Sequence, residues 1–157
     1  YGLAGLRIGW AVAAPDMSAA LWRRHEYAVI TAAAPSMTLA AIALEGAKRR
    51  QLLDRQRAIT RQGFKVLEGW LPAQEGRFSW HANDATSIAF VRLHLPVSSF
   101  AFAERVRQDA SVLIAPGSAL GAEDYLRITV GYEPGKVQAA LDRIGMVAAR
   151  LGAAQRV

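Results

Sequence analysis

The segment Tyr125-Leu-Arg-Ile-Thr-Val-Gly-Tyr132 has the clearest strand pattern in the chain. Its residues alternate, so that Leu126, Ile128 and Val130 share one face of an extended strand while Arg127 lies on the other. If a helix covers the apolar face, Arg127 is held at mid-strand on a rigid element, on the opposite face. From the residues alone, the simpler interpretation of this position is an exposed arginine that pairs with an acid.

The residues on both sides of this strand predict a small α/β domain with a helical layer on a sheet. Before the strand, the pattern predicts strands at 78–81 and 87–93, a helix from Ser98 or Ser99 to Asp109, and a strand at 112–115. After it, Pro134 begins a helix that ends at Gly152. The inward face of this helix is predicted to carry Val137, Leu141, Ile144, Ala148 and Leu151.

The first half of the chain is predicted to be mainly helical, after a short strand at 8–14. Asp16 is placed to cap a helix over 18–26, in which Leu21 and Trp22 face inward. A much longer helix is predicted from Ser36 to about Leu71, with a bend at Gly63. About 35 helical residues span about 50 Å, too much for one small core, so this helix is expected to connect two domains. The tryptophans are expected to be core anchors, namely Trp10, Trp22, Trp70 and Trp80.

Composition excludes several classes of function. The 157 residues contain no cysteine, which excludes disulfides and thiolate metal sites and fits a reducing cytoplasm. The net charge is +6, but the basic residues are scattered among acidic ones. They are not interleaved with aromatic residues, so they lack the pattern of a nucleic-acid-binding surface. The apolar stretch 27–44 contains Pro35 and several hydroxyl side chains, so it is not a membrane span. The three histidines have no metal-ligand spacing, and no metal site is expected.

The first ten residues, Tyr1-Gly-Leu-Ala-Gly-Leu-Arg-Ile-Gly-Trp10, combine flexible glycines with a single cation. Gly2 and Gly5 allow the backbone to approach another backbone or a ligand closely. The guanidinium of Arg7 has the planar fork that binds phosphate or carboxylate through two hydrogen bonds. The segment therefore predicts an anion site at Arg7.

Two motifs resemble those of the fold-type I pyridoxal-phosphate-dependent aminotransferases, class I/II. Gly-Leu-x-Gly-Leu-Arg-x-Gly at the amino end resembles the segment that follows the Schiff-base lysine of that family. Val112-Leu-Ile-Ala-Pro116-Gly117-Ser118-Ala-Leu-Gly121, followed by Tyr125-Leu-Arg127-Ile, resembles its small-domain motif Pro-Gly-x-x-Phe-Gly…Arg-Leu/Ile. Leu120 stands where the family often has an aromatic residue, so the resemblance does not define the pocket for the substrate's side chain.

The resemblance implies an aspartate-aminotransferase-like α/β fold. Residues 1–45 would be the end of the large cofactor-binding domain and the start of the interdomain helix, and residues 46–157 the small carboxy-terminal domain. Arg7 would contact the phosphate of pyridoxal 5′-phosphate, and Arg127 the α-carboxylate of the substrate. The Schiff-base lysine is expected just upstream of Tyr1, so that these residues alone would contain no catalytic residue.

The activity implied is transfer of an amino group between an amino acid and a 2-oxo acid, by a cytoplasmic homodimer of amino-acid metabolism. Two alternatives remain open. A lyase, decarboxylase or cyclase of the same fold would share both arginines, and His25-Glu-Tyr27 followed by Pro35-Ser36 resembles a subgroup that includes capreomycidine synthase-like enzymes. A non-catalytic aminotransferase-like domain of a transcription regulator is the third interpretation.

Overall fold

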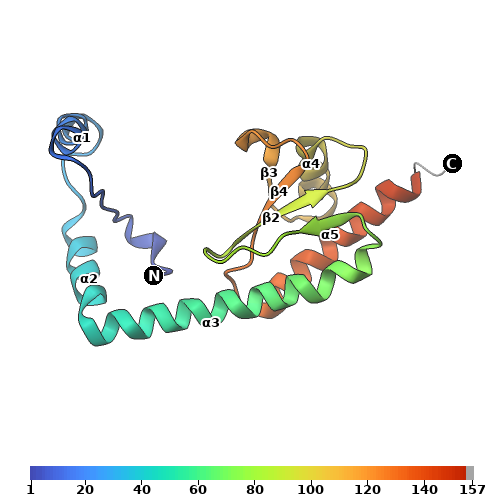
Figure 1. The fold of residues 1–157 in the computed structure, drawn as a ribbon, viewed down its shortest axis with the longest axis horizontal. Helices are drawn as coiled ribbons and strands as arrows, with labels where there is room; N and C mark the ends of the chain where they lie inside the picture. Colours follow the sequence, from blue (N-terminus) through green and yellow to red (C-terminus); the bar gives the residue numbers. More distant parts are fainter. Residues whose placement is uncertain (155–157) are drawn as a thin grey trace. The chain divides into compact units, whose positions relative to one another are not determined.

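The computed structural model describes residues 1–154 and divides into two compact units, Tyr1–Gln56 and Arg57–Val157. The division falls within helix α3 (Gly46–Trp70), the longest helix of the described residues. Figure 1 shows α3 as one uninterrupted helix, and its 25 residues correspond to a length of about 37 Å. The predicted domain boundary after residue 45 lies at the start of this helix and stays a prediction.

The second unit is built on a four-stranded antiparallel sheet in the order β1-β2-β4-β3. Its elements follow α3 in the order η2 (Leu71–Gln74), β1 (Phe78–Trp80), β2 (Ile88–Leu93), α4 (Ser99–Ala110), β3 (Ala115–Pro116), η3 (Gly117–Leu120), β4 (Tyr125–Thr129) and α5 (Pro134–Ala154). The predicted β-β-α-β-β-α order of this unit is confirmed.

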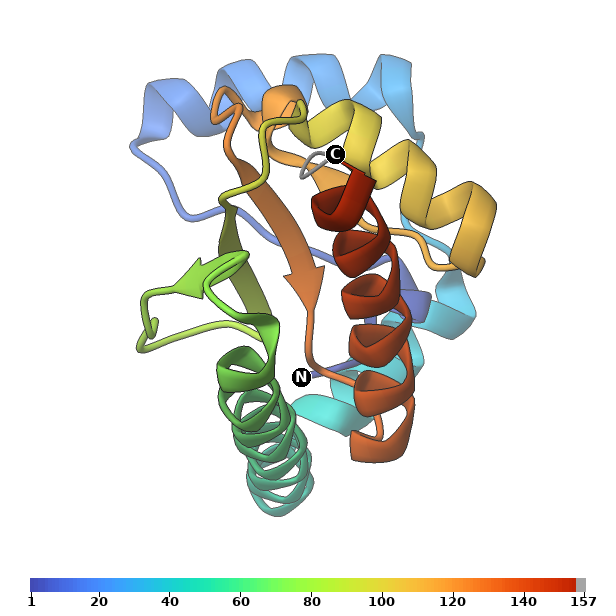
Figure 2. The same ribbon diagram turned by 90° about the vertical axis from the view of Figure 1, so that its right-hand side faces the viewer.

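One face of the sheet forms the core, because apolar residues alternate along both central strands. Ala89 and Val91 of β2 and Leu126 and Ile128 of β4 are buried on this face, while their neighbours along each strand are more exposed. Helices α4 and α5 pack against each other and cover this face, as Figure 2 shows for the yellow and red helices beside β4. The predicted inward face of α5 is also confirmed, since its members are buried or packed against the core.

The first unit contains η1 (Ala4–Leu6), α1 (Pro15–Ala28) and α2 (Ala34–Leu44), and it has almost no core of its own. Within residues 1–56, all of which the structure describes, only Ala43 is buried. The prediction that Trp10 and Trp22 anchor a core is wrong for this chain, since they are 65% and 64% exposed, and Leu21 is exposed as well. Trp70 is buried and Trp80 is packed against the core, as predicted.

Several predicted elements of the first half differ in the structure. The strand predicted at 8–14 is irregular chain, because an isolated apolar stretch forms a strand only when another strand pairs with it. Helix α1 begins at Pro15 with Ala14 at the N-cap, so Asp16 lies in the first turn and its side chain does not cap the helix.

The helix predicted from Ser36 to Leu71 is two helices that are separated at Glu45. This residue has a ψ of 140°, which ends α2, while its carbonyl oxygen accepts a 2.7 Å hydrogen bond from the Arg49 N–H and so begins α3. Glycine at position 46 follows directly and is the poorest helix former after proline, which explains why the break occurs there.

Three smaller differences concern the second unit. A strand is predicted at 112–115, but the observed strand β3 consists of Ala115 and Pro116 only. Strand β4 ends at Thr129. Gly152 lies inside α5, which continues to Ala154, so it is not the C-cap. None of the helices described here, over residues 1–154, combines the length and the apolar character needed to cross a membrane.

Gly63 does not bend α3; it permits a close approach between helix and sheet. A Cβ at this position would collide with the carbonyl oxygen of Val130, directly after β4. Backbone atoms cannot move aside as the end of a flexible side chain can. The glycine is therefore required by packing.

We expect Gly63→Ala to lower the free energy of unfolding by about 1–3 kcal/mol, the usual cost of overpacking a core. Gly69→Ala is the matched control, because Gly69 lies in the same helix and a Cβ there meets nothing within 4 Å. The control should be neutral or stabilising by up to about 1 kcal/mol, since alanine is the better helix former. Urea unfolding measures both changes, and equal stability of the two variants would contradict the packing role.

Candidate functional site

Arg127 lies at the middle of β4, on the sheet face that the helices leave uncovered. Its register partners are Phe90 on β2 and Ala115 on β3. The residue is exposed, and in the part of the chain that the structure describes no hydrogen bond or ion pair involves its side chain. The simpler sequence interpretation, an arginine that pairs with an acid, is therefore not what residues 1–154 show.

A cavity of about 500 Å³ lies beside Arg127, between the β3 edge of the sheet and α5. Its walls are mainly apolar and come from residues 112–116 and from the inward side of α5. The polar residues that line it are Arg127, Thr129, Tyr132 and Lys136, and no acidic residue is among them. The cavity thus offers a positively charged margin, which favours an anion with an apolar portion.

The turn that precedes β4 is fixed to the amino end of α4 through Ser99, whose side chain is fully buried. The backbone N–H and the hydroxyl of Ser99 both donate to Oε1 of Glu123, at 2.9 and 3.3 Å. The hydroxyl oxygen also accepts a 3.1 Å hydrogen bond from the Ser118 N–H. These three bonds connect both ends of the 118–123 turn to one residue, and so determine where β4 begins.

Gly117 makes the same turn possible by its lack of a side chain. A Cβ at Gly117 would collide with the carbonyl oxygens of Ala122 and Tyr125. Gly121 ends η3 with a φ of 78°, a left-handed conformation that glycine adopts without strain. Both glycines of the Pro-Gly-x-x-x-Gly stretch therefore have a local structural reason, independent of any ligand.

Arg7 ends η1 in a left-handed conformation, with a φ of 53°. Its side chain is exposed, and its one hydrogen bond among the described residues is a long one, 3.4 Å from Nη1 to the carbonyl oxygen of Ala4. Gly2 has a φ of 65° and no room for a side chain against Gln56, as close approach requires. A Cβ at Gly5 would meet nothing within 4 Å, so the predicted close approach at Gly5 involves none of the residues described here and stays a prediction.

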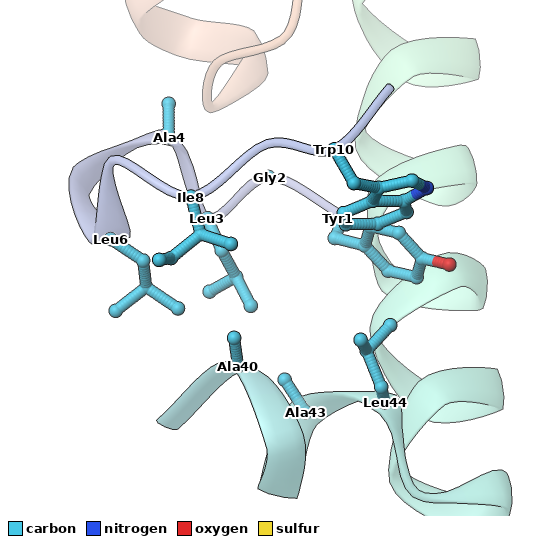
Figure 3. A pocket seen from close by; sticks show the side chains of 10 residues that line it. All are labelled: Tyr1, Gly2, Leu3, Ala4, Leu6, Ile8, Trp10, Ala40, Ala43 and Leu44. Carbon is cyan, nitrogen blue, oxygen red and sulfur yellow. The ribbon is translucent and has the colours of Figure 1, made fainter. Parts of the chain in front are cut away.

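An apolar pocket of about 260 Å³ lies next to Arg7 in the first unit. Figure 3 shows Leu6 and Ile8 directed toward Ala40 and Ala43 of α2, with the rings of Tyr1 and Trp10 beside each other. Arg7 does not line this pocket, although both of its chain neighbours do. The backbone conformation therefore separates the cation from the apolar side chains around it.

Among the described residues, Arg7 and Arg127 have no acid partner, whereas four other arginines do. Arg77, Arg92, Arg105 and Arg107 each pair with a nearby carboxylate. On α4, hydrogen bonds from Arg107 and from Gln108 lower the pKa of Glu104 to about 2, so this carboxylate is already occupied. The two candidate arginines keep an unneutralised guanidinium, whose paired donors fit the oxygens of a carboxylate or a phosphate.

The structure assigns the two candidate residues to different units, Arg7 to the first and Arg127 to the second. Sequence reasoning found both arginines but missed Ser99 and Glu123, and it missed the aromatic residues next to Arg127. Those contacts depend on which strands and turns become neighbours in space, and no local pattern in the sequence gives that information.

The family model described as Aminotransferase class I and II matches residues 1–144. Capreomycidine synthase of Streptomyces vinaceus is 30% identical over 128 residues, which are 82% of this chain and 32% of that protein. The LL-diaminopimelate aminotransferase of Moorella thermoacetica is 27% identical over 151 residues, which are 94% of this chain and 37% of that protein.

A solved structure, a PLP-dependent aminotransferase from Streptococcus suis, resembles the fold over 96% of this chain and 40% of its own, with a TM-score of 0.84 and 25% identity. This likeness confirms the predicted aminotransferase fold. The chain spans about a third of the length of the curated relatives, at 32% and 37%.

We expect Ser99→Ala to lower the free energy of unfolding by about 1–3 kcal/mol, because the Ser118 N–H loses its partner at a partly buried place and the Glu123 carboxylate loses one of its two bonds to Ser99. The measurement is chemical denaturation of the variant beside the wild type. Stability within about 0.5 kcal/mol of the wild type, the usual range for a neutral surface change, would show that Ser99 does not hold the turn.

Proposed function

This chain belongs to the family of class I and II aminotransferases, and on that premise we propose that its protein transfers an amino group between an amino acid and a 2-oxo acid. The observation that carries the proposal is the match of residues 1–144 together with the unneutralised Arg127. Pyridoxal 5′-phosphate is the cofactor that the family and its PLP-dependent relatives identify.

In the proposed activity, Arg127 binds the α-carboxylate of the amino acid. Two parallel hydrogen bonds from one guanidinium fix both the position and the plane of a carboxylate, which a lysine cannot do. The antiparallel neighbours of β4 on both sides make Arg127 part of a rigid sheet, so the carboxylate is held at a defined place.

Arg7 is proposed to contact the phosphate of the cofactor. When bound, pyridoxal phosphate supplies an electron sink for the bonds at the substrate α-carbon. The exposed Arg7 guanidinium, which no described carboxylate neutralises, fits a phosphate and keeps its charge at any working pH. The lysine that holds the cofactor covalently is proposed to lie outside these 157 residues.

A second candidate is a cyclase or lyase of the same fold. The 30% identity to capreomycidine synthase favours it, as does the stretch His25-Glu-Tyr27 with Pro35-Ser36. Both candidates use a carboxylate clamp and a phosphate contact, so the two arginines support either one. The two candidates are separated by analysing the products formed from an amino acid with and without a 2-oxo acid. Amino-group transfer requires the 2-oxo acid, whereas a cyclase or lyase forms its product without it.

We also propose that the protein is a cytoplasmic homodimer of amino-acid metabolism. Large apolar side chains are exposed along the first unit, including Met17, Trp22, Tyr27, Ile30 and Leu39. So many exposed large apolar side chains within 56 residues support a surface that other protein covers. The absence of cysteine supports a reducing compartment.

The covalent link is tested by the intact mass of the full-length, cofactor-loaded protein before and after borohydride reduction. We expect reduction to make the cofactor permanently attached, at a lysine outside these 157 residues. The chain of 157 residues alone is the control and should retain none. Attachment at Lys48, Lys65 or Lys136, or no attachment at all, would contradict the proposal.

Arg127→Lys is expected to lower kcat/KM for the amino acid by about 10- to 150-fold, as roughly 1.5–3 kcal/mol of charged hydrogen bonding is lost. Cofactor affinity should not change. The matched control is Arg105→Lys on α4, an exposed arginine whose partner is Asp109. Steady-state kinetics measure both variants, and an unchanged kcat/KM for Arg127→Lys would remove Arg127 from the site.

A further inference from the structure

An aromatic pair lies beside Arg127 on the uncovered face of the sheet. Phe90 is directly across from Arg127 in the β2–β4 register, and Tyr125 precedes it by two residues on the same face of β4. The two rings are stacked, with centroids 4.7 Å apart and planes inclined by 4°. Neither ring belongs to the buried core, and Phe90 is 36% exposed.

The pair limits the space that the Arg127 side chain can occupy. Residues directly opposite on antiparallel strands have Cβ atoms about 4.5–5.5 Å apart, so Phe90 is the immediate cross-strand neighbour of Arg127. Tyr125 fills the adjacent position along β4. On the β3 side the register partner is Ala115, whose methyl group leaves room. Arg127 is also one of the residues that line the cavity between the β3 edge and α5.

The acid that lies three residues before Arg127 in the sequence has a different arginine as its partner. Asp124, which precedes Tyr125, makes an ion pair with Arg92 at 3.4 Å, and Arg92 is the register partner of Tyr125. In the register, Tyr125 lies level with Arg92, and Phe90 lies level with Arg127. Arg127 thus keeps its charge available for a ligand.

We infer that Phe90 and Tyr125 are positioning residues, whose stacked rings hold the Arg127 guanidinium in the orientation that receives a carboxylate. The inference rests on the proposed function, since it takes the ligand of Arg127 to be the carboxylate of an amino acid. A side chain ordered before binding loses less conformational entropy on binding, so the rings raise affinity without touching the substrate.

The test uses the full-length, cofactor-loaded protein with Phe90→Leu, Phe90→Tyr and the control Phe100→Leu. Phe100 is 65% exposed on α4 and so provides the same substitution away from Arg127. We expect Phe90→Leu to raise KM for the amino acid by about 3- to 10-fold, the cost of ordering one free side chain, with kcat within about twofold. Phe90→Tyr retains a flat ring and should restore KM to within about twofold of the wild type.

A double-mutant cycle with Arg127→Lys separates positioning from general stability. In the Arg127→Lys background, which lacks the guanidinium, Phe90→Leu should lower kcat/KM by less than about twofold more, because the effects of coupled residues are not additive. NMR relaxation of the Arg127 Nε–Hε group gives a readout without catalysis and should show an ordered group that becomes mobile in Phe90→Leu.

The outcomes separate this inference from the proposed function. If the wild type transfers no amino group and binds no amino acid, the proposed function fails. If the wild type is active and Arg127→Lys is impaired, but Phe90→Leu behaves as Phe100→Leu, the positioning role alone is overturned. Additive losses in the cycle, or an unchanged Arg127 signal in Phe90→Leu, overturn it as well.

Discussion

The antiparallel pairing of β2 with β4 is the constraint on which the second unit depends. It places Val91 opposite Leu126 and Ala89 opposite Ile128, and these residues form the middle of the core. The same pairing places Phe90 opposite Arg127 on the uncovered face. A shift of one residue would exchange the two faces, exposing the core and burying the guanidinium. Stability and ligand chemistry are therefore determined by a single register.

The supports around this register come from positions that are distant in sequence. Ser99 on α4 connects to Glu123 and Ser118, and Gly63 on α3 allows the helix to lie against the Val130 carbonyl group. Both contacts act on the ends of β4, one before it and one after it. A strand that is fixed at both ends presents its central residue with little freedom, as the clamping of a planar anion requires.

The sequence predicted the second unit well, because its strands and helices have strong periodic patterns and clear helix start signals at Ser98 and Pro134. Period two also assigned Arg127 to the uncovered face without knowledge of the partner strand, whereas its proposed role came from the resemblance to a family. The first unit was predicted less well: the strand at 8–14 and the buried Trp10 and Trp22 assume neighbours that residues 1–56 do not supply. The Phe90–Tyr125 stack could not be foreseen, because it depends on the register between β2 and β4, and the two residues are 35 positions apart in the sequence.

The scarcity of buried residues in the first unit has a consequence for biosynthesis. Residues 57–154 contain a complete apolar cluster with mostly short connections, so they are able to collapse soon after synthesis. Residues 1–56 leave a ribosome earlier and carry exposed tryptophan, isoleucine and leucine side chains without a core to receive them. Such a segment is a natural client for chaperones and a starting point for aggregation until other protein covers it.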